Sequence, residues 1–417
     1  MYKILCFFIF FIQSMFIHAQ NDTFGWFPAG IENSYTQACA SYKNYILNSE
    51  ILNPLFEKLL QLKSATNNQK VNFVHIGDSH IQADMMTSVI RNALQNQFGN
   101  AGRGLVFPYQ AAKTNGPNDY LFGSPYNWTS SRINKQSRPI EVGISGFGLQ
   151  TNNNFSMLDF KQKQGIYFDK IRLISQKSSY GVDFYNPSDS IIFGFSKKSK
   201  SKWDAYDIIL PYKIDAFQLH MHTDQMDSMN LFGVILENES QKGVLYHTIG
   251  ANGAKYSDYF NNDFFKNQLT ELKADCYIIS MGTNEAQDND LSYMDIYDIV
   301  EKSVAHIQSI SPNTPIILST PSCSYLKKKY PNPNLTTVRA AMEHFAFTHQ
   351  LAFYDLFTIC QCESQTDVWR TSNLLNNDLV HYTQKGYQLQ GDLFNQAFAN
   401  AWNYFIETKK SSKIEDK

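Results

Sequence analysis

The chain has 417 residues, of which 43% are hydrophobic and 18% are charged, and its formal net charge is −2. This length allows two domains, and this composition is typical of a globular protein with a sizeable core. The near-neutral charge argues against a nucleic-acid partner, because nucleic-acid-binding proteins usually carry an excess of basic residues.

The N-terminus indicates export. Lys3 precedes an apolar stretch over residues 4–17, and the small residue Ala19 follows it. The alternative is a membrane anchor, but the stretch contains two polar residues and is shorter than the ~20 apolar residues of a spanning helix. We therefore predict a signal peptide over residues 1–19. The mature protein would be periplasmic or extracellular, with no stable membrane span after signal removal.

Short apolar runs alternate with helical patterns along much of the chain, which predicts a parallel sheet with crossover helices. The expected strands cover residues 71–77, 244–250, 276–281, 315–320 and 351–356. The expected helices cover residues 54–62, 82–97, 256–272, 293–309, 336–348 and 385–405. Five parallel strands with intervening helices make a three-layer α/β/α sandwich.

Residues 115–242 have a different pattern. They are rich in Gly, Asn, Ser and aromatic residues, and turn signals separate short alternating segments such as IYFDKIRLIS and DAFQLHMH. This pattern predicts an antiparallel β-sandwich inserted into the α/β domain. The α/β domain then comprises residues 20–114 and 243–408, and residues 409–417 form a solvated tail.

Signal removal would leave an odd number of cysteines, namely Cys39, Cys276, Cys323, Cys360 and Cys362. An exported protein can form disulfides, but the pairing cannot be read from the sequence. Cys276 and Cys323 lie in or beside apolar runs, so we expect buried thiols there. Cys360 and Cys362 lack the two-residue spacer of a redox or zinc motif, so metal binding has little support.

Candidate functional residues follow three of the expected strands, at the edge where open α/β sheets usually bind their ligands. Ser79 in GDSH follows the first strand, Gly253 in GANGAK the second and Asn284 in SMGTNEA the third. A serine near a helix N-terminus can be a nucleophile, and a glycine N–H and an asparagine amide can stabilise an oxyanion. Each fragment alone also fits an ordinary turn or helix cap.

The loop before the last helix, NNDLVHYTQKGY, supplies Asp378 and His381. One short loop can thus present an imidazole as a base, with a carboxylate that orients it and stabilises its charged form. With Ser79, these two residues form a candidate Ser–His–Asp triad.

These four blocks, in this order, resemble the GDSL/SGNH hydrolase family over about residues 71–109 and 243–405. The resemblance implies a flavodoxin-like fold, the catalytic triad Ser79, Asp378 and His381, and no metal or organic cofactor. It also implies an oxyanion hole formed by Ser79, Gly253 and Asn284.

Two residues depart from the family pattern. Glu285 replaces the usual Asp of the third block, and His80 replaces the Leu of GDSL. His80 is a candidate for the substrate pocket, or alternatively a helix-capping residue.

The insertion extends the resemblance to peptidoglycan O-acetylesterases whose inserted domain is similar to a carbohydrate-binding module. It implies an exported esterase that removes O-acetyl groups from a glycan, most of all peptidoglycan. Two alternatives stay open: a catalytically inactive glycan-binding surface protein, and an esterase that acts on another acetylated polysaccharide or a lipid ester.

Other candidates have weaker support. His220, His222 and Asp224 alternate in QLHMHTDQ, but further metal ligands are not identifiable, so an ordinary polar strand face is the simpler interpretation. The basic cluster over residues 197–202 is expected to be a solvated loop. Trp128 and Trp203 could stack on sugars, although tryptophans more often pack inside.

Overall fold

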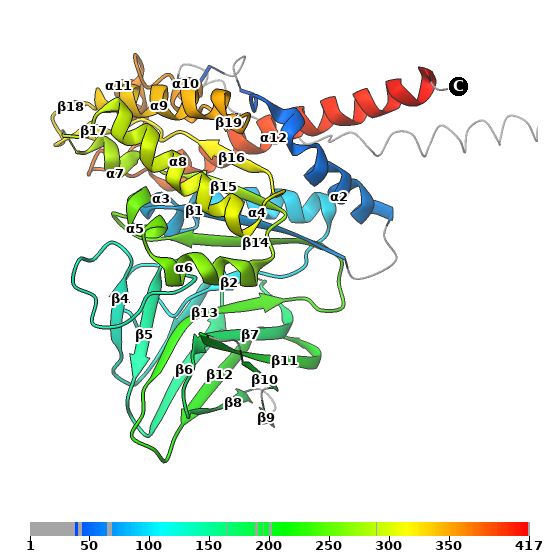
Figure 1. Ribbon diagram of the computed structural model, residues 1–417, viewed down its shortest axis with the longest axis vertical. Coiled ribbons are helices and arrows are strands. Elements are labelled where there is room, and N and C mark those ends of the chain that lie inside the picture. Colours follow the sequence, from blue (N-terminus) through cyan, green and yellow to red (C-terminus); the bar gives the residue numbers. More distant parts are fainter. Residues whose placement is uncertain are drawn as a thin grey trace, which may run out of the picture.

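The computed structural model describes residues 38–40, 44–64, 69–163, 165–187, 191–194, 196–199, 202–288 and 290–415. The expected signal peptide lies outside these residues. Figure 1 shows two stacked parts, an α/β part above and a β part below, with the C-terminal helix projecting from the α/β part. No helix in the described ranges is long and apolar enough to cross a membrane.

A five-stranded parallel sheet is the centre of the α/β part. Its strands lie in the order β14 (Gly243–Gly250), β1 (Lys70–Gly77), β15 (Cys276–Ser280), β16 (Ile316–Ser319) and β19 (Ala352–Tyr354). Numbered along the chain, this is the 2-1-3-4-5 order of flavodoxin-like sheets. The strands are almost entirely buried, which explains why they appear in the sequence as continuous apolar runs. The expected fold class is confirmed.

Two groups of helices cover this sheet. One group contains α2 (Asn53–Ser64), α4 (Met85–Phe98) and α12 (Gln384–Glu415). The other contains α5 (Tyr256–Phe260), α6 (Asp263–Gln268), α8 (Tyr293–Ile310) and α9 (Asn334–Thr348), and Figure 1 shows α8 in front of the sheet. The short elements are η3 (Ser49–Leu52), α3 (Ser79–Gln82), η4 (Leu269–Leu272), α7 (Thr283–Ala286), β17 (Tyr325–Leu326), β18 (Tyr330–Pro331), α10 (Leu356–Ile359) and α11 (Thr366–Thr371).

Two helices differ from expectation. The helix expected over residues 256–272 is divided into α5, α6 and η4, because Asn262 begins a new helix and its Oδ1 accepts a hydrogen bond from the Phe265 N–H at 2.9 Å. The last helix continues to Glu415, into the segment expected to be a tail. That segment contains no Pro or Gly that would end a helix.

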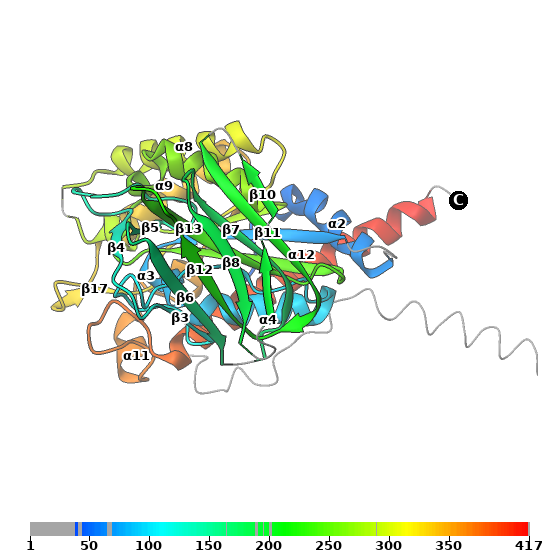
Figure 2. The same ribbon diagram turned by 90° about the horizontal axis from the view of Figure 1, so that it is seen from below.

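The β part consists of two antiparallel sheets, which Figure 2 shows from below. One sheet has the order β10–β11–β7–β13–β5–β4, with β2 also paired to β13, and the other has the order β3–β6–β12–β8–β9. The strands are β2 (Gly104–Val106), β3 (Tyr120–Gly123), β4 (Thr129–Arg132), β5 (Phe147–Thr151), β6 (Phe155–Gln162), β7 (Phe168–Gln176), β8 (Gly181–Asn186), β9 (Ile191–Gly194), β10 (Ser196–Ser199), β11 (Trp203–Ile214), β12 (Ala216–His222) and β13 (Met229–Glu237).

The two sheets pack through aromatic side chains. The Phe217 ring lies 4.9 Å from the Phe160 ring within its own sheet and 5.7 Å from the Phe168 ring of the facing sheet, measured between centroids. The chain therefore has, as expected, a β domain in addition to the α/β domain. The β part begins before residue 115, because Val106 of β2 already pairs with Val234 of β13.

Cys323 and Cys362 form a disulfide with a Cα–Cα distance of 4.8 Å. The expectation of a free thiol at Cys323 is therefore wrong, since a partner distant in the sequence lies beside it. Cys39, Cys276 and Cys360 are buried free thiols. The described residues contain no group of His, Cys, Asp and Glu side chains arranged to hold a metal ion.

Candidate active site

Three of the expected blocks emerge at one edge of the parallel sheet. In β1, Gly77 pairs with Gly250 of β14 on one side and with Ser280 of β15 on the other. A Cβ atom at Gly77 would lie 2.7 Å from the Ser280 carbonyl oxygen, so a larger residue would push the neighbouring strand away. The blocks after these strands therefore meet at the carboxyl end of the sheet.

Ser79 is the first residue of α3, which is a single turn. The residue that caps this turn is Asp78, whose Oδ1 accepts a hydrogen bond from the His80 N–H at 2.9 Å. Ser79 is half-buried, and its Oγ contacts His381 instead of a backbone N–H of this turn. The alternative interpretation of Ser79 as a helix cap is therefore wrong.

Ser79, His381 and Asp378 lie in one chain of hydrogen bonds. Ser79 Oγ is 2.7 Å from His381 Nε2, and His381 Nδ1 is 2.8 Å from Asp378 Oδ2. About two-fifths of each of the His381 and Asp378 side chains is exposed, at 38% and 39%, so the group lies at the surface where a large substrate could reach it. This is the arrangement that activates a serine nucleophile.

Backbone contacts hold the carboxylate and the imidazole in this position. Burial alone would raise the pKa of Asp378. Hydrogen bonds from the Val380 and His381 N–H groups and from the His381 ring have the larger, opposite effect, so the pKa of Asp378 lies below its ordinary value. The loop is closed at its base by a bridge between Leu375 and Tyr382. The carboxyl group is therefore held in the charged form that a protonated imidazole needs.

The expected oxyanion donors lie around the serine. Gly253 is exposed and has φ +78°, and within the described residues its N–H and that of Ser79 have no hydrogen-bond partner. The Asn284 amide donates to the Ala254 carbonyl at 3.0 Å and to Asp78 Oδ2 at 3.2 Å. The two N–H groups are therefore free to donate to a ligand, whereas Asn284 has to release its longer bond to Asp78 before it can donate elsewhere.

One contact at this site comes from the β part and was not expected. Asn134 Nδ2 donates to the Asn252 carbonyl oxygen at 2.8 Å. This carbonyl belongs to the same peptide unit as the Gly253 N–H, so the bond fixes the orientation of that N–H and polarises it. No local motif marks Asn134, because its partner is 118 residues away in the sequence.

Glu285, which directly follows Asn284, is buried. Its Oε1 accepts a hydrogen bond from the Tyr256 N–H, the first residue of α5, at 2.7 Å. Burial raises the pKa of Glu285 to about 7, against the lowering effect of this hydrogen bond. Glu285 thus links the third block to the helix that follows the Gly253 loop.

His80 lies beside His381. Its Nδ1 is 2.9 Å from the Tyr387 hydroxyl, and its ring centroid is 5.2 Å from that of His381. Burial and the nearby His381 lower the pKa of His80 more than the Asp78 and Asp378 carboxylates raise it. His80 also lines a small cavity with Ser280 and Ser322, and its role in a substrate pocket stays a prediction.

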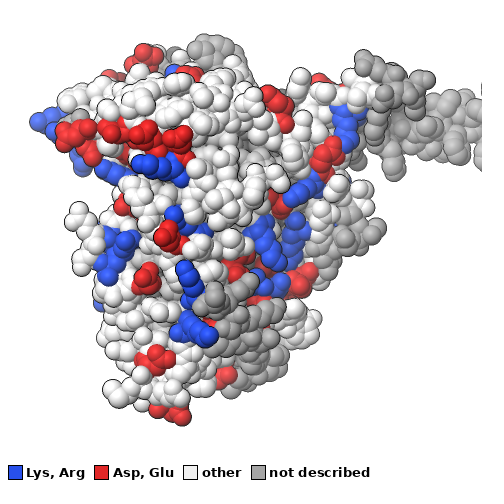
Figure 3. Space-filling view, viewed as in Figure 1, with Lys and Arg blue, Asp and Glu red and all other residues white. Residues whose placement is uncertain are grey.

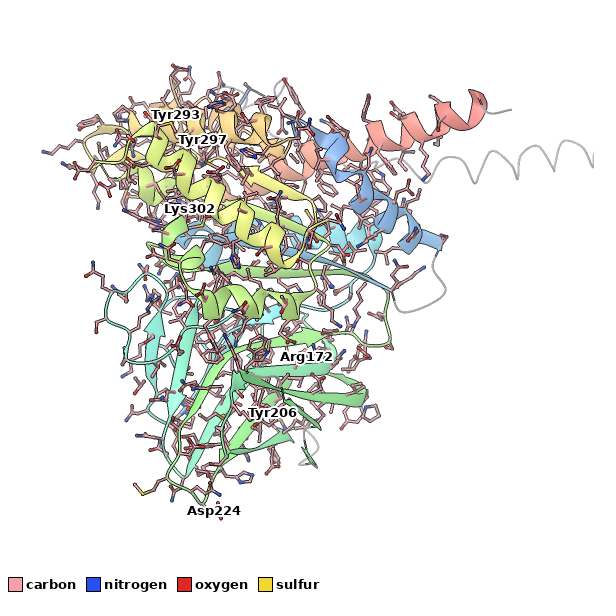
Figure 4. The ribbon with its side chains drawn as sticks, in the orientation of Figure 1. Arg172, Tyr206, Asp224, Tyr293, Tyr297 and Lys302 are labelled. Carbon is pink, nitrogen blue, oxygen red and sulfur yellow. A yellow bond between two sulfur atoms is a disulfide. The ribbon has the colours of Figure 1, made fainter. Side chains whose placement is uncertain are left out.

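The remaining candidates lie away from this site. Trp128 and Trp203 are only 8% exposed, so they do not form a sugar-stacking surface. His222 Nε2 is 3.0 Å from Asp183 Oδ2, and Figure 4 shows Asp224 at the lower end of the β part. The expectation of a loop over residues 197–202 is wrong for residues 197–199, which belong to β10 and pair with β11. The side chains of residues 197–201 lie outside the described residues.

The flavodoxin-like sheet, with a serine and its hydrogen-bonded histidine at the carboxyl edge, defines a class of protein: the carboxylic ester hydrolases of SGNH type. Residues 228–389 match the model of the GDSL-like lipase/acylhydrolase family, so the chain carries a GDSL-like hydrolase domain and the resemblance is confirmed. Ser79 lies outside the matched residues. No curated protein matches the chain.

Three solved structures that match this chain differ widely in their similarity to it. A peptidoglycan O-acetylesterase is 20% identical, covers 84% of this chain and 96% of its own, and has a TM-score of 0.70. A family two carbohydrate esterase from Cellvibrio japonicus is 6% identical, with coverages of 68% and 98% and a TM-score of 0.29. A lipolytic G-D-S-L family protein from Veillonella parvula is 14% identical, with coverages of 37% and 80% and a TM-score of 0.30. The first of these structures shares its fold with this chain over most of both chains.

Proposed function

We propose that this protein is an exported serine esterase that removes O-acetyl groups from a glycan, with peptidoglycan as the first candidate. The observation that carries the proposal is the hydrogen-bonded chain from Ser79 through His381 to Asp378. The similar fold of a peptidoglycan O-acetylesterase supports the choice of substrate.

The reaction follows from the positions of the groups. His381 Nε2 takes the proton of Ser79 Oγ as that oxygen attacks the acetyl carbonyl carbon, and Asp378 stabilises the imidazolium. The negative oxygen of the tetrahedral intermediate accepts hydrogen bonds from the Ser79 and Gly253 N–H groups and from Asn284. The bond between the acyl carbon and the sugar oxygen then breaks, and His381 returns the proton to that oxygen.

The second half of the reaction regenerates the enzyme. The acetyl group is now esterified to Ser79, and His381 takes a proton from a water molecule as the water attacks this ester. Collapse of the second intermediate breaks the bond to Ser79 Oγ, which takes the proton back from His381. Acetate leaves.

Export is supported by two features. The N-terminal residues have the pattern of a signal peptide. The disulfide between Cys323 and Cys362 is of a kind that persists mainly in oxidising compartments.

The main test is the Ser79→Ala variant, with acetate release from O-acetylated peptidoglycan and from acetylated xylan as the readout. We expect turnover to fall by roughly a thousandfold or more, since the nucleophile is removed. The thermal unfolding midpoint should stay near that of the parent protein, because Ser79 is half-buried on a one-turn helix. Parent-like activity of Ser79→Ala would contradict the proposal, and faster release from xylan would redirect the substrate assignment.

A further inference from the structure

A hollow near the Gly253 loop is lined by residues of the β part and of the segment that leads into it. It has a volume of about 270 Å³, and its walls come from the segment between β2 and β3, from β3 itself and from Lys163, which directly follows β6. Its lining residues include Gln110, Asn115, Asn118, Leu121 and Lys163. All five are exposed, so the hollow is an open groove.

The groove offers hydrogen-bonding groups that the protein itself does not use. The side chains of Gln110, Asn118 and Lys163 have no hydrogen-bond or ion-pair partner within the described residues. Leu121 is 37% exposed beside them, and Tyr109 forms part of the wall. Side-chain amides can both donate to and accept from hydroxyl and acetamido groups, and an aliphatic side chain can pack on the apolar face of a sugar ring.

The groove is continuous with the oxyanion loop. Asn115 Oδ1 accepts a hydrogen bond from Asn252 Nδ2 at 2.6 Å, and Asn252 directly precedes Gly253. Gln82 bridges these two residues. Its Nε2 donates to the Asn115 carbonyl at 2.6 Å, and its Oε1 accepts from the Asn252 N–H at 2.6 Å. One end of the groove therefore lies one residue from the N–H expected to bind the oxyanion.

We propose that this groove binds the glycan strand on one side of the acetylated sugar, and that it selects strands that carry acetamido groups. The proposal rests on the esterase function and specifies its substrate class. A strand whose acetyl ester lies at Ser79 would pass Asn252 and Asn115 and place its next sugars against Asn118, Leu121 and Lys163. A small acetyl ester would not reach these residues.

The test compares the double variant Asn118→Ala/Lys163→Ala with the parent on two substrates. On soluble O-acetylated peptidoglycan fragments we expect kcat/KM to fall about tenfold, mainly through a higher KM, because two ligand contacts are lost. On p-nitrophenyl acetate we expect kcat/KM to stay within about twofold, because the catalytic groups are unchanged. The matched control is Asn154→Ala/Lys213→Ala, two exposed residues of the β part outside this groove.

A binding measurement separates the groove from the esterase function. Calorimetric titration of the Ser79→Ala variant with the same fragments needs no turnover, and adding Asn118→Ala/Lys163→Ala should weaken binding about tenfold. Equal losses on both ester substrates, or unchanged fragment affinity, would overturn the groove proposal. Weakened fragment binding with no acetate release by the parent would support the groove and refute the esterase.

Discussion

Asn134 belongs to the β part, yet it contacts the peptide unit that carries the Gly253 N–H. An N–H that stabilises an oxyanion has to be oriented before the charge forms, because reorientation during the reaction costs free energy. We expect Asn134→Ala to lower kcat about tenfold and to leave KM nearly unchanged, since the lost interaction acts on the transition state. Steady-state kinetics on p-nitrophenyl acetate would measure this split.

Two further variants make this experiment specific. Asn134→Asp should be at least as damaging, because a carboxylate cannot donate to the Asn252 carbonyl and repels it. Lys135→Ala is the matched control, as Lys135 is the exposed neighbour in the same turn. A higher KM with unchanged kcat in Asn134→Ala would show that Asn134 acts on substrate binding rather than on the oxyanion N–H.

At the scale of elements, Glu285 joins α7 to the first residue of α5. Burial raises the pKa of Glu285 from 4.5 to about 7, so the folded protein keeps the proton at pH values where the unfolded chain releases it. The folded state binds more protons between pH 4.5 and 7, so the free energy of unfolding falls as the pH rises through this window. The difference amounts to about 3 kcal/mol.

Glu285→Gln removes this dependence, because glutamine is neutral at every pH and its Oε1 can still accept from the Tyr256 N–H. We expect the variant to match the parent near pH 5 and to be more stable at pH 8, by up to about 3 kcal/mol. Urea unfolding at four pH values between 5 and 8 measures the difference, and Glu301→Gln, at an exposed position of α8, controls for the loss of one charge. A stability difference independent of pH would show that Glu285 is ionised in the folded protein.

The elements differ in how far the sequence predicts them. The strands are predicted well because both sheet faces are buried, so each appears as a continuous apolar run, as in β14. Ser79, Gly253 and Asn284 could be proposed from the sequence because each follows such a strand. The break at Asn262 was missed because the apolar pattern of a helix continues across it. Asn134 and the Cys323–Cys362 disulfide could not be predicted, because each depends on residues brought together by the folded chain.

At the scale of the whole molecule, the two parts are joined by several kinds of contact. Lys70 at the start of β1 forms ion pairs with Glu237 of β13 at 2.6 Å and with Glu239 at 3.3 Å. Trp203 at the start of β11 adds a hydrogen bond, from its Nε1 to the Oε1 of Glu271 in η4, at 3.2 Å. Figure 3 shows basic and acidic side chains intermixed over this face, in keeping with the net charge of −2. These contacts, with the bond from Asn134, make the position of the β part a determinant of the active-site geometry.

The export proposal makes a prediction about the whole chain that can be measured on protein purified from exporting cells. The sequence contains six cysteines. Cleavage after Ala19 removes Cys6, and the disulfide takes Cys323 and Cys362, so the mature protein should have three free thiols, at Cys39, Cys276 and Cys360. Alkylation of the unreduced, denatured protein followed by intact mass spectrometry would count these thiols and give the mass of a chain that begins at Gln20.

A matched control uses the cytoplasmic form. The same chain produced without residues 1–19 in a reducing cytoplasm should have five free thiols after denaturation, because the disulfide would not persist there. Oxidation of that form should lower the count to three and raise the free energy of unfolding by about 4 kcal/mol, given a sequence separation of 39 residues between the paired cysteines. An exported protein that retains Met1, or that has five free thiols after cleavage, would contradict the prediction.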